Sequence, residues 1–307
     1  MMNAVAIEKT MHRQGVRSRN TGGGLLRGLL ASTRAEALRL RKWPAFWVLL
    51  GTWILLNLAF TYLFNYLAYT TGESGRMSNG LPKDALLQQM LPAAVPEVFT
   101  QGMAMFGGAL MLILGALATG SGFGWGTWKT GFTQGPSRTS AIGATMVALL
   151  VVVGGLVCVA FLIDTGVAAV IGASRSQELV LPSLGRVALG IGVGTAILGM
   201  WTLAGAFIGA IARGPALAVG LGLVWVLVVE NLLRGVAGIF AAVAAITDHL
   251  PGTAAGSLAG SMRTTDGQAV PGVLDILSRT ESLIVLGIYA VLFVAGTIVL
   301  MRRRDLI

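Results

Sequence analysis

The chain has 307 residues, of which 55% are hydrophobic and only 11% are charged. A soluble domain carries about 25% charged residues, so this composition argues against a single water-soluble core and indicates that lipid surrounds most of the chain. The net charge of +9 fits either nucleic-acid binding or membrane topology, and the positions of the charges decide between the two.

The first 43 residues are basic and precede every long apolar run. Residues 1–24 are polar, and no short apolar core with a small-residue cleavage site follows them, so we expect a disordered cytoplasmic tail rather than a signal peptide. Residues 25–43 have an amphipathic pattern. Arg27, Arg34 and Arg41 recur there at a spacing of seven, beside a neighbouring apolar stripe that Glu36 and Arg39 interrupt.

Six apolar segments reach the length of roughly 20 residues that a helix needs to cross a bilayer. The predicted spans are 44–68, 98–119, 141–163, 187–212, 215–233 and 283–301. The apolar segment 236–246 has only 11 residues and cannot cross alone, so we expect it to be re-entrant or interfacial. The predicted fold is therefore an all-α polytopic membrane domain over residues 44–301, with a cytoplasmic end at 302–307.

The basic residues are concentrated on one side of this predicted topology. With the N-terminus in the cytoplasm, the inner segments carry 15 Lys and Arg residues, whereas the outer loops carry six together with nine acidic residues. This bias is typical of cytoplasmic segments and accounts for the positive charge without any nucleic acid. We therefore expect a multi-pass protein of the cytoplasmic membrane with both termini in the cytoplasm.

The predicted spans contain almost no charged side chains. Asp164 is expected at the outer end of the third span, and Glu230 and Arg234 share one face near the outer boundary of the fifth. We expect Glu230 and Arg234 to form a structural pair, with a gating or substrate role as the alternative. One such pair is too little for a proton pathway, so any transport would take its energy from elsewhere. With a single cysteine and two distant histidines, neither a disulfide nor a metal site is expected.

The glycine-rich segment 121–140, SGFGWGTWKTGFTQGPSRTS, has the composition of a phosphate-binding loop but not its pattern. A nucleotide loop needs a glycine directly before its lysine and a strand ahead of it, whereas Trp128 precedes Lys129 and a membrane helix precedes the glycines. No bound nucleotide or other cofactor is therefore predicted. The topology places the segment in the cytoplasm between spans two and three, as a surface for a partner or as a membrane anchor.

In their order along the chain, Gly126-Thr127, Lys129 and Pro136-Ser137-Arg138 resemble the coupling region in permeases of type-2 ABC exporters. The segment LLRGLLASTRAEALRLRKW is similar to the interfacial helix that precedes the first span in that family. The resemblance implies six spans, that interfacial helix, and a short coupling helix between spans two and three. Two family features are missing, a glutamate shortly before the Gly-Thr pair and a lysine early in span three.

The resemblance further implies that two permease subunits, identical or different, pair with two separate ATPase subunits. Those ATPases would bind ATP and Mg, so this chain would hold no cofactor and catalyse nothing. Its substrate would be hydrophobic or amphipathic. The residues expected to contact the ATPase are Thr127, Trp128, Lys129, Pro136 and Arg138.

The alternative is a membrane-embedded enzyme or assembly factor without transport activity. Such a protein needs a polar catalytic cluster at one membrane face. The predicted outer loop 247–281 contains candidates without catalytic spacing, so a solvated loop is expected there: Asp248, His249, Asp266, Asp275 and Glu281.

Overall fold

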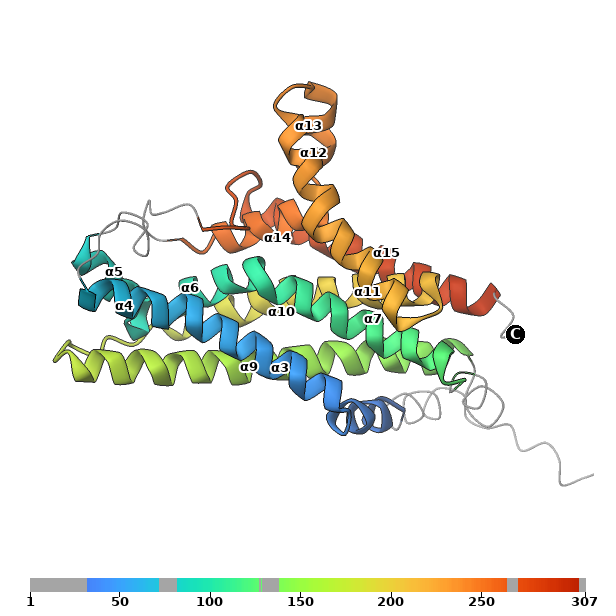
Figure 1. Ribbon diagram of the computed structural model, residues 1–307, viewed down its shortest axis with the longest axis horizontal. Helices are drawn as coiled ribbons and strands as arrows, with labels where there is room; N and C mark the ends of the chain where they lie inside the picture. The colour runs from blue at the N-terminus through green and yellow to red at the C-terminus, as the bar shows by residue number, and fades with distance from the viewer. Residues whose placement is uncertain (1–31, 72–81, 127, 129–137, 264–269, 304–307) are drawn as a thin grey trace, which may run out of the picture.

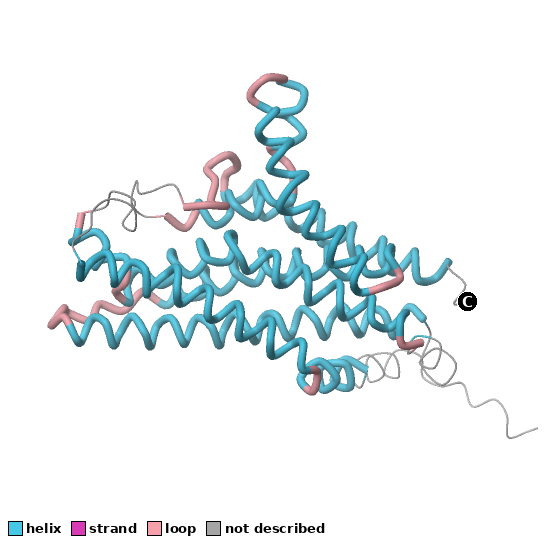
Figure 2. The backbone as a smooth tube through the Cα atoms, viewed as in Figure 1, coloured by secondary structure: helices cyan, strands magenta, loops and turns pink. Residues whose placement is uncertain are grey.

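The computed structural model describes residues 32–71, 82–126, 128, 138–263 and 270–303, and this part of the chain is helical and contains no strand (Figures 1 and 2). The all-α prediction is therefore confirmed. A helix over 32–41 comes first, followed by an unbroken helix composed of α3 (Pro44–Leu58), the π-helical turn η1 (Ala59–Leu63) and α4 (Phe64–Thr71). Pro44 starts this helix at a position where its missing N–H does no harm.

The remaining elements follow in two groups. The first is α5 (Lys83–Gln89), the 3-10 turn η2 (Pro92–Ala94), α6 (Val95–Gly102), the π turn η3 (Met103–Gly107), α7 (Gly108–Gly124) and α9 (Arg138–Ser174). The second is α10 (Leu184–Ala212), α11 (Pro215–Val224), the π turn η4 (Trp225–Val229), α12 (Glu230–Ala237), α13 (Ala241–Thr247), α14 (Pro251–Gly260) and α15 (Arg279–Arg303).

Among the described residues, five helices are long and apolar enough to cross a membrane: Pro44–Thr71, Thr139–Ser174, Leu184–Ala212, Pro215–Ala237 and Arg279–Arg303. Each contains one predicted span, which is consistent with an all-α polytopic membrane protein. The predicted span 98–119 lies on α6, η3 and α7, which follow one another without a break, but its apolar α-helix, α7, has only 17 residues. A sixth crossing therefore stays a prediction.

The third predicted span is longer than its apolar core suggested. Helix α9 has 37 residues, which corresponds to about 55 Å at about 1.5 Å per residue, against a hydrocarbon core of about 30 Å. Asp164 was expected at the outer end of this span, and its depth in the membrane stays a prediction. It lies ten residues before the end of α9 and is 1% exposed.

The region after the fifth span also differs from expectation. The segment 236–246 is not one helix, because α12 ends at Ala237 and α13 begins at Ala241, and α12 and α13 project from the body of the molecule (Figure 1). The buried short helix is instead α14, in which eight of ten residues are buried. The prediction of a solvated loop over 247–281 is therefore wrong for this part, which packs against α15, α10 and α6.

Several basic residues of the described chain lie toward one end of the bundle (Figure 1). The 32–41 helix, the end of α7, the turn between α10 and α11, and the end of α15 all lie toward the same end of the bundle, on the right of Figure 1. We call this the basic end. It carries Arg34, Arg39, Arg41, Lys42, Arg213, Arg302 and Arg303. The arrangement agrees with the predicted charge asymmetry, and the side of the membrane that the basic end faces stays a prediction.

The most extensive contact between two helices joins α7 and α10, and it depends on glycines. A Cβ on Gly115 would overlap the carbonyl oxygen of Thr202, and a Cβ on Gly205 would overlap that of Leu112. The two backbones therefore touch directly, in the way that small residues permit between helices in lipid.

Gly205→Ala is expected to destabilise the protein by about 1–3 kcal/mol, because the added methyl forces α7 and α10 apart. Gly192→Ala on the same helix is the matched control, since its Cβ would meet nothing within 4 Å and alanine favours a helix over glycine by about 1 kcal/mol. Thermal unfolding of both variants in detergent measures the difference. Equal stability of the two would contradict the close backbone contact.

Candidate functional site

Of the five residues predicted to contact an ATPase, two lie within the described part of the chain. Trp128 is buried, and Arg138 is the first residue of α9, whereas Thr127, Lys129 and Pro136 lie outside the described residues. The indole of Trp128 donates a hydrogen bond to the carbonyl oxygen of Thr119 over 3.1 Å. A Cβ on Gly122 would overlap this indole, so the glycine provides the space in which the ring lies. Trp128 is thus anchored on the end of α7.

Trp128 belongs to a hydrophobic cluster that joins several segments of the basic end. Leu40 comes from the 32–41 helix, Met301 from the end of α15, and the rest from α7, α9 and α10. We call it the basic-end cluster, and its members are Leu40, Ala118, Trp128, Ile142, Met146, Leu149, Leu203, Ala206, Ala210 and Met301. Packed side chains therefore connect Trp128 and the 32–41 helix to α7, α9 and α10.

The 32–41 helix also contacts the bundle through polar groups. Arg39 forms an ion pair with Glu36 at 2.9 Å and donates to the carbonyl oxygen of Ala118 over 3.4 Å. Burial raises the pKa of Glu36, and the charge of Arg39 acts in the opposite direction. These two residues, which interrupt the sequence pattern, thus tie the helix to α7. Of the predicted arginine stripe, Arg34 and Arg41 are exposed, and Arg27 lies outside the described residues.

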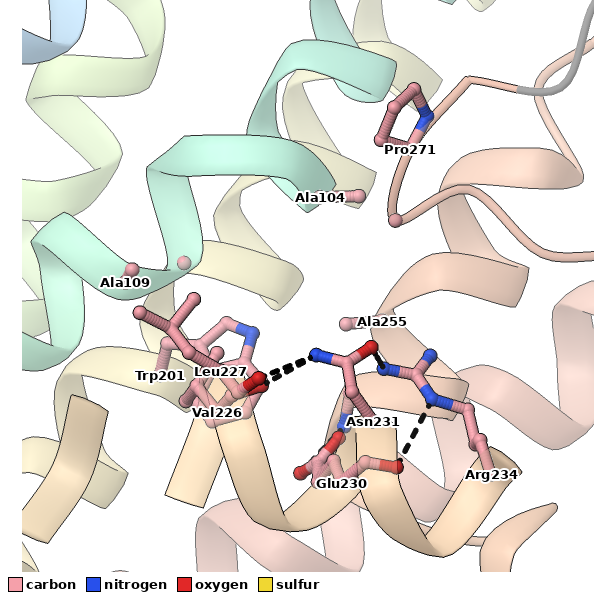
Figure 3. A pocket seen from close by; sticks show the side chains of 13 residues that line it. Ala104, Ala109, Trp201, Val226, Leu227, Glu230, Asn231, Arg234, Ala255 and Pro271 are labelled. Carbon is pink, nitrogen blue, oxygen red and sulfur yellow. Dashed lines mark hydrogen bonds between the residues drawn. The ribbon is translucent and has the colours of Figure 1, made fainter. Parts of the chain in front are cut away.

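Glu230 and Arg234 are neighbours, but they do not pair through their charged groups. The Glu230 carboxylate accepts hydrogen bonds from the Trp225 indole at 2.9 Å and from the backbone N–H of Gly252 at 3.3 Å. Arg234 donates to the backbone carbonyl of Glu230 at 3.4 Å and to Asn231 Oδ1 at 3.1 Å (Figure 3). The expected pair is therefore not a carboxylate–guanidinium ion pair.

The local backbone explains the contacts of Glu230. The π turn η4 covers Trp225–Val229, and a π turn places residues five apart on one face, so Trp225 reaches the Glu230 side chain. Gly252 is the second residue of α14, and a Cβ there would overlap the carboxylate. A negative charge at this helix start satisfies one free N–H group and interacts favourably with the helix dipole. Glu230 thus fastens α14 to α12.

A cavity of about 220 Å³ lies beside these residues, and Figure 3 shows its lining. Small residues such as Ala104, Gly108 and Ala255 create the space, with Trp201 on one side and Asn231 and Arg234 as polar groups. Ligand pockets for drug-sized molecules measure about 300–1,000 Å³, so the cavity fits a small group or one part of a larger molecule.

Two partners of Glu230 were missed by the sequence analysis. Trp225 precedes Glu230 by five residues, a spacing that shares a face in a π turn but not in a regular α-helix. Gly252 lies 22 residues further along the chain, in a region expected to be a solvated loop. A glutamate within an apolar helix was the one signal that pointed to this position.

Glu230→Ala is expected to destabilise the attachment of α14 by about 1–3 kcal/mol, because the N–H groups of Trp225 and Gly252 lose their acceptor. Glu230→Gln is the matched control, since its amide oxygen still accepts from Trp225 and Gly252. Hydrogen–deuterium exchange of Gly252–Gly260 measures the effect, with faster exchange in the alanine variant than in the glutamine variant. Unchanged exchange in both variants would show that the carboxylate does not hold α14.

Comparison with known proteins does not place the chain in a family. No protein-family model matches the sequence, and a comparison with curated proteins gives no match either. The geometry of the basic end and of the Glu230 region, together with the motifs in the sequence, therefore carries the functional argument.

Proposed function

We propose that this chain is the membrane-spanning permease subunit of an ATP-driven exporter of the type-2 ABC class. In this proposal six helices cross the cytoplasmic membrane, the sixth being the stretch over α6, η3 and α7, and the basic end faces the cytoplasm. The basic-end cluster is the observation that supports it most. It brings together Trp128, from the segment resembling a coupling helix, and Leu40, from the segment resembling an interfacial helix.

The ATPase subunits would bind ATP and Mg and supply the energy. Their closure would press on residues 127–138 and on the 32–41 helix. Because Trp128 is buried and bonded to Thr119, the segment cannot move there without moving the end of α7. The glycine contact would carry that displacement from α7 to α10, because neither backbone has room to slip past the other.

The substrate class follows from the same reasoning. The small-residue lining of the spans and the cavity beside Trp201 suit a hydrophobic or amphipathic molecule, of which one group enters the cavity. A second permease subunit, identical or different, completes the complex in this proposal.

The alternative, a membrane enzyme or assembly factor, needs a catalytic cluster that the described residues do not favour. His249 Nδ1 lies 3.1 Å from the carbonyl oxygen of Ala245, and Glu281 accepts from the backbone N–H of Ser278, so both side chains have local structural contacts. Asp266 lies outside the described residues, and no group of three His, Cys, Asp or Glu that could hold a metal occurs in the described part.

Lys129→Cys and Arg138→Cys are expected to crosslink to the ATPase subunit in membranes that contain both proteins, and the yield should change when ATP is added. Cys158 is exposed on α9 and is first replaced by Ala, so that the new thiol is the one that reacts. Glu178→Cys, at the opposite end of α9 in an exposed loop, is the control and should give no adduct.

A second pair of variants tests the role of the basic-end cluster in the same assay. Trp128→Ala should remove the ATP dependence of the crosslinks, whereas Trp125→Ala should preserve it because that ring is 71% exposed. If neither cysteine forms an ATPase adduct, the exporter proposal fails. If the crosslink yield keeps its ATP dependence in both tryptophan variants, the exporter proposal stands. The basic-end cluster is then not the element that couples the ATPase to the spans.

A further inference from the structure

A second buried carboxyl group lies away from the regions described above, between α9 and the 44–71 helix. Asp164 is 1% exposed, and the Nδ2 atom of Asn57 lies 2.8 Å from its Oδ1 and 2.9 Å from its Oδ2. Asn57 is itself buried and stands at the middle of the 28-residue helix 44–71. The Tyr62 hydroxyl donates to the Asp164 carbonyl oxygen at 3.2 Å. These bonds join two helices inside the apolar part of the bundle.

No described cation neutralises this carboxyl group. Within the described ranges, no Lys, Arg or His forms an ion pair with Asp164 within 4 Å. Arg175, further along α9, places its guanidinium 5.1 Å from the ring centres of both Tyr66 and Tyr69 and donates to the Tyr66 hydroxyl. Tyr62 on η1 contacts Asp164 through its hydroxyl, and Glu97 lies on α6, which packs against α9, where it accepts a bond from Gln101.

An ionised carboxylate with one amide donor is costly inside a lipid-facing bundle, because a buried charge needs a countercharge or several hydrogen bonds. A neutral carboxylic acid avoids this cost but needs an acceptor for its proton. Asn57 supplies one, since rotation of its amide exchanges Nδ2 and Oδ1 and the hydrogen-bond network determines which atom faces Asp164. After this rotation the amide nitrogen occupies the present position of Asn57 Oδ1, which lies 3.5 Å from Thr61 Oγ1. Its N–H group then points toward that hydroxyl oxygen.

We propose that Asp164 and Asn57 form a proton-binding site between α9 and the 44–71 helix. The proton is bonded to one Asp164 oxygen and shared with Asn57 Oδ1 while the two helices are in contact. When the helices separate and water enters, the O–H bond breaks, the proton passes to water, and a hydrated carboxylate remains. The site binds a proton from water and returns it, so no other reactant is needed. This proposal does not depend on the exporter assignment.

The backbone around the site favours such a movement. The π turn η1 begins two residues after Asn57, and the π turn η3 begins directly after Gly102, which faces Asn57. A Cβ on Gly102 would lie only 2.6 Å from Asn57 Oδ1, so the glycine lets the amide fit. Single π turns inside α-helices occur often at functional sites.

Infrared spectroscopy of the purified full-length protein in lipid nanodiscs at neutral pH tests this proposal. A protonated carboxyl group has a carbonyl stretch that is separate from the carboxylate bands. We expect the wild type to show this acid band, Asp164→Asn to lose it, and Glu230→Gln, which removes the other carboxyl group that is buried among the described residues, to retain it. Asn57→Leu should shift its frequency, because the acid loses its hydrogen-bond partner.

The outcomes decide between a proton site and a purely structural carboxylate. An acid band that is absent from the wild type, or that persists at full strength in Asp164→Asn, overturns the proposal. If Asp164→Asn does not fold, the Asn57→Leu variant still decides. A band unmoved in that variant contradicts the shared proton, and a shifted band supports it.

Discussion

The close contact between α7 and α10 is the constraint on which the rest of the structure depends. Apolar surface gives no net attraction between helices in lipid, so association relies on packing, and here two glycines let the backbones touch. The same two helices contribute Ala118 and Leu203 to the basic-end cluster. They also form one wall of the cavity, where a Cβ on Gly108 would lie 2.6 Å from the Trp201 ring. One contact thus positions both candidate regions.

Buried polar groups make the second set of connections, and each joins elements that are distant in sequence. Glu230 connects α12 to α14 through the backbone N–H of Gly252, while Asp164 connects α9 to the 44–71 helix through Asn57. In both cases the partner is an uncharged group, and a π turn lies next to the contact. The bundle thus combines close glycine contacts between helices with buried carboxyl groups beside π turns.

The sequence predicted the apolar helices well and the polar contacts poorly. The length of an apolar run is a direct signal for a span, and the helices containing 44–68, 187–212 and 215–233 follow it closely. Helix α14 was missed because its alanine, serine, threonine and glycine residues are only moderately apolar, and packing rather than hydropathy buries them. The length of α9 was underestimated because the helix continues past the apolar run that defined the span. The partner of each buried carboxyl is set by tertiary packing, which spacing along the chain does not reveal.

The orientation of the basic end is the claim on which the functional proposal depends most. Lys42→Cys at that end and Glu178→Cys at the other end, each exposed and each introduced with Cys158 replaced by Ala, allow a membrane-impermeant maleimide to measure it. We predict that Glu178→Cys reacts in intact cells and that Lys42→Cys reacts only after the cells are permeabilised. Labelling of Lys42→Cys in intact cells would place the basic end outside, where no ATP-driven partner could act on it.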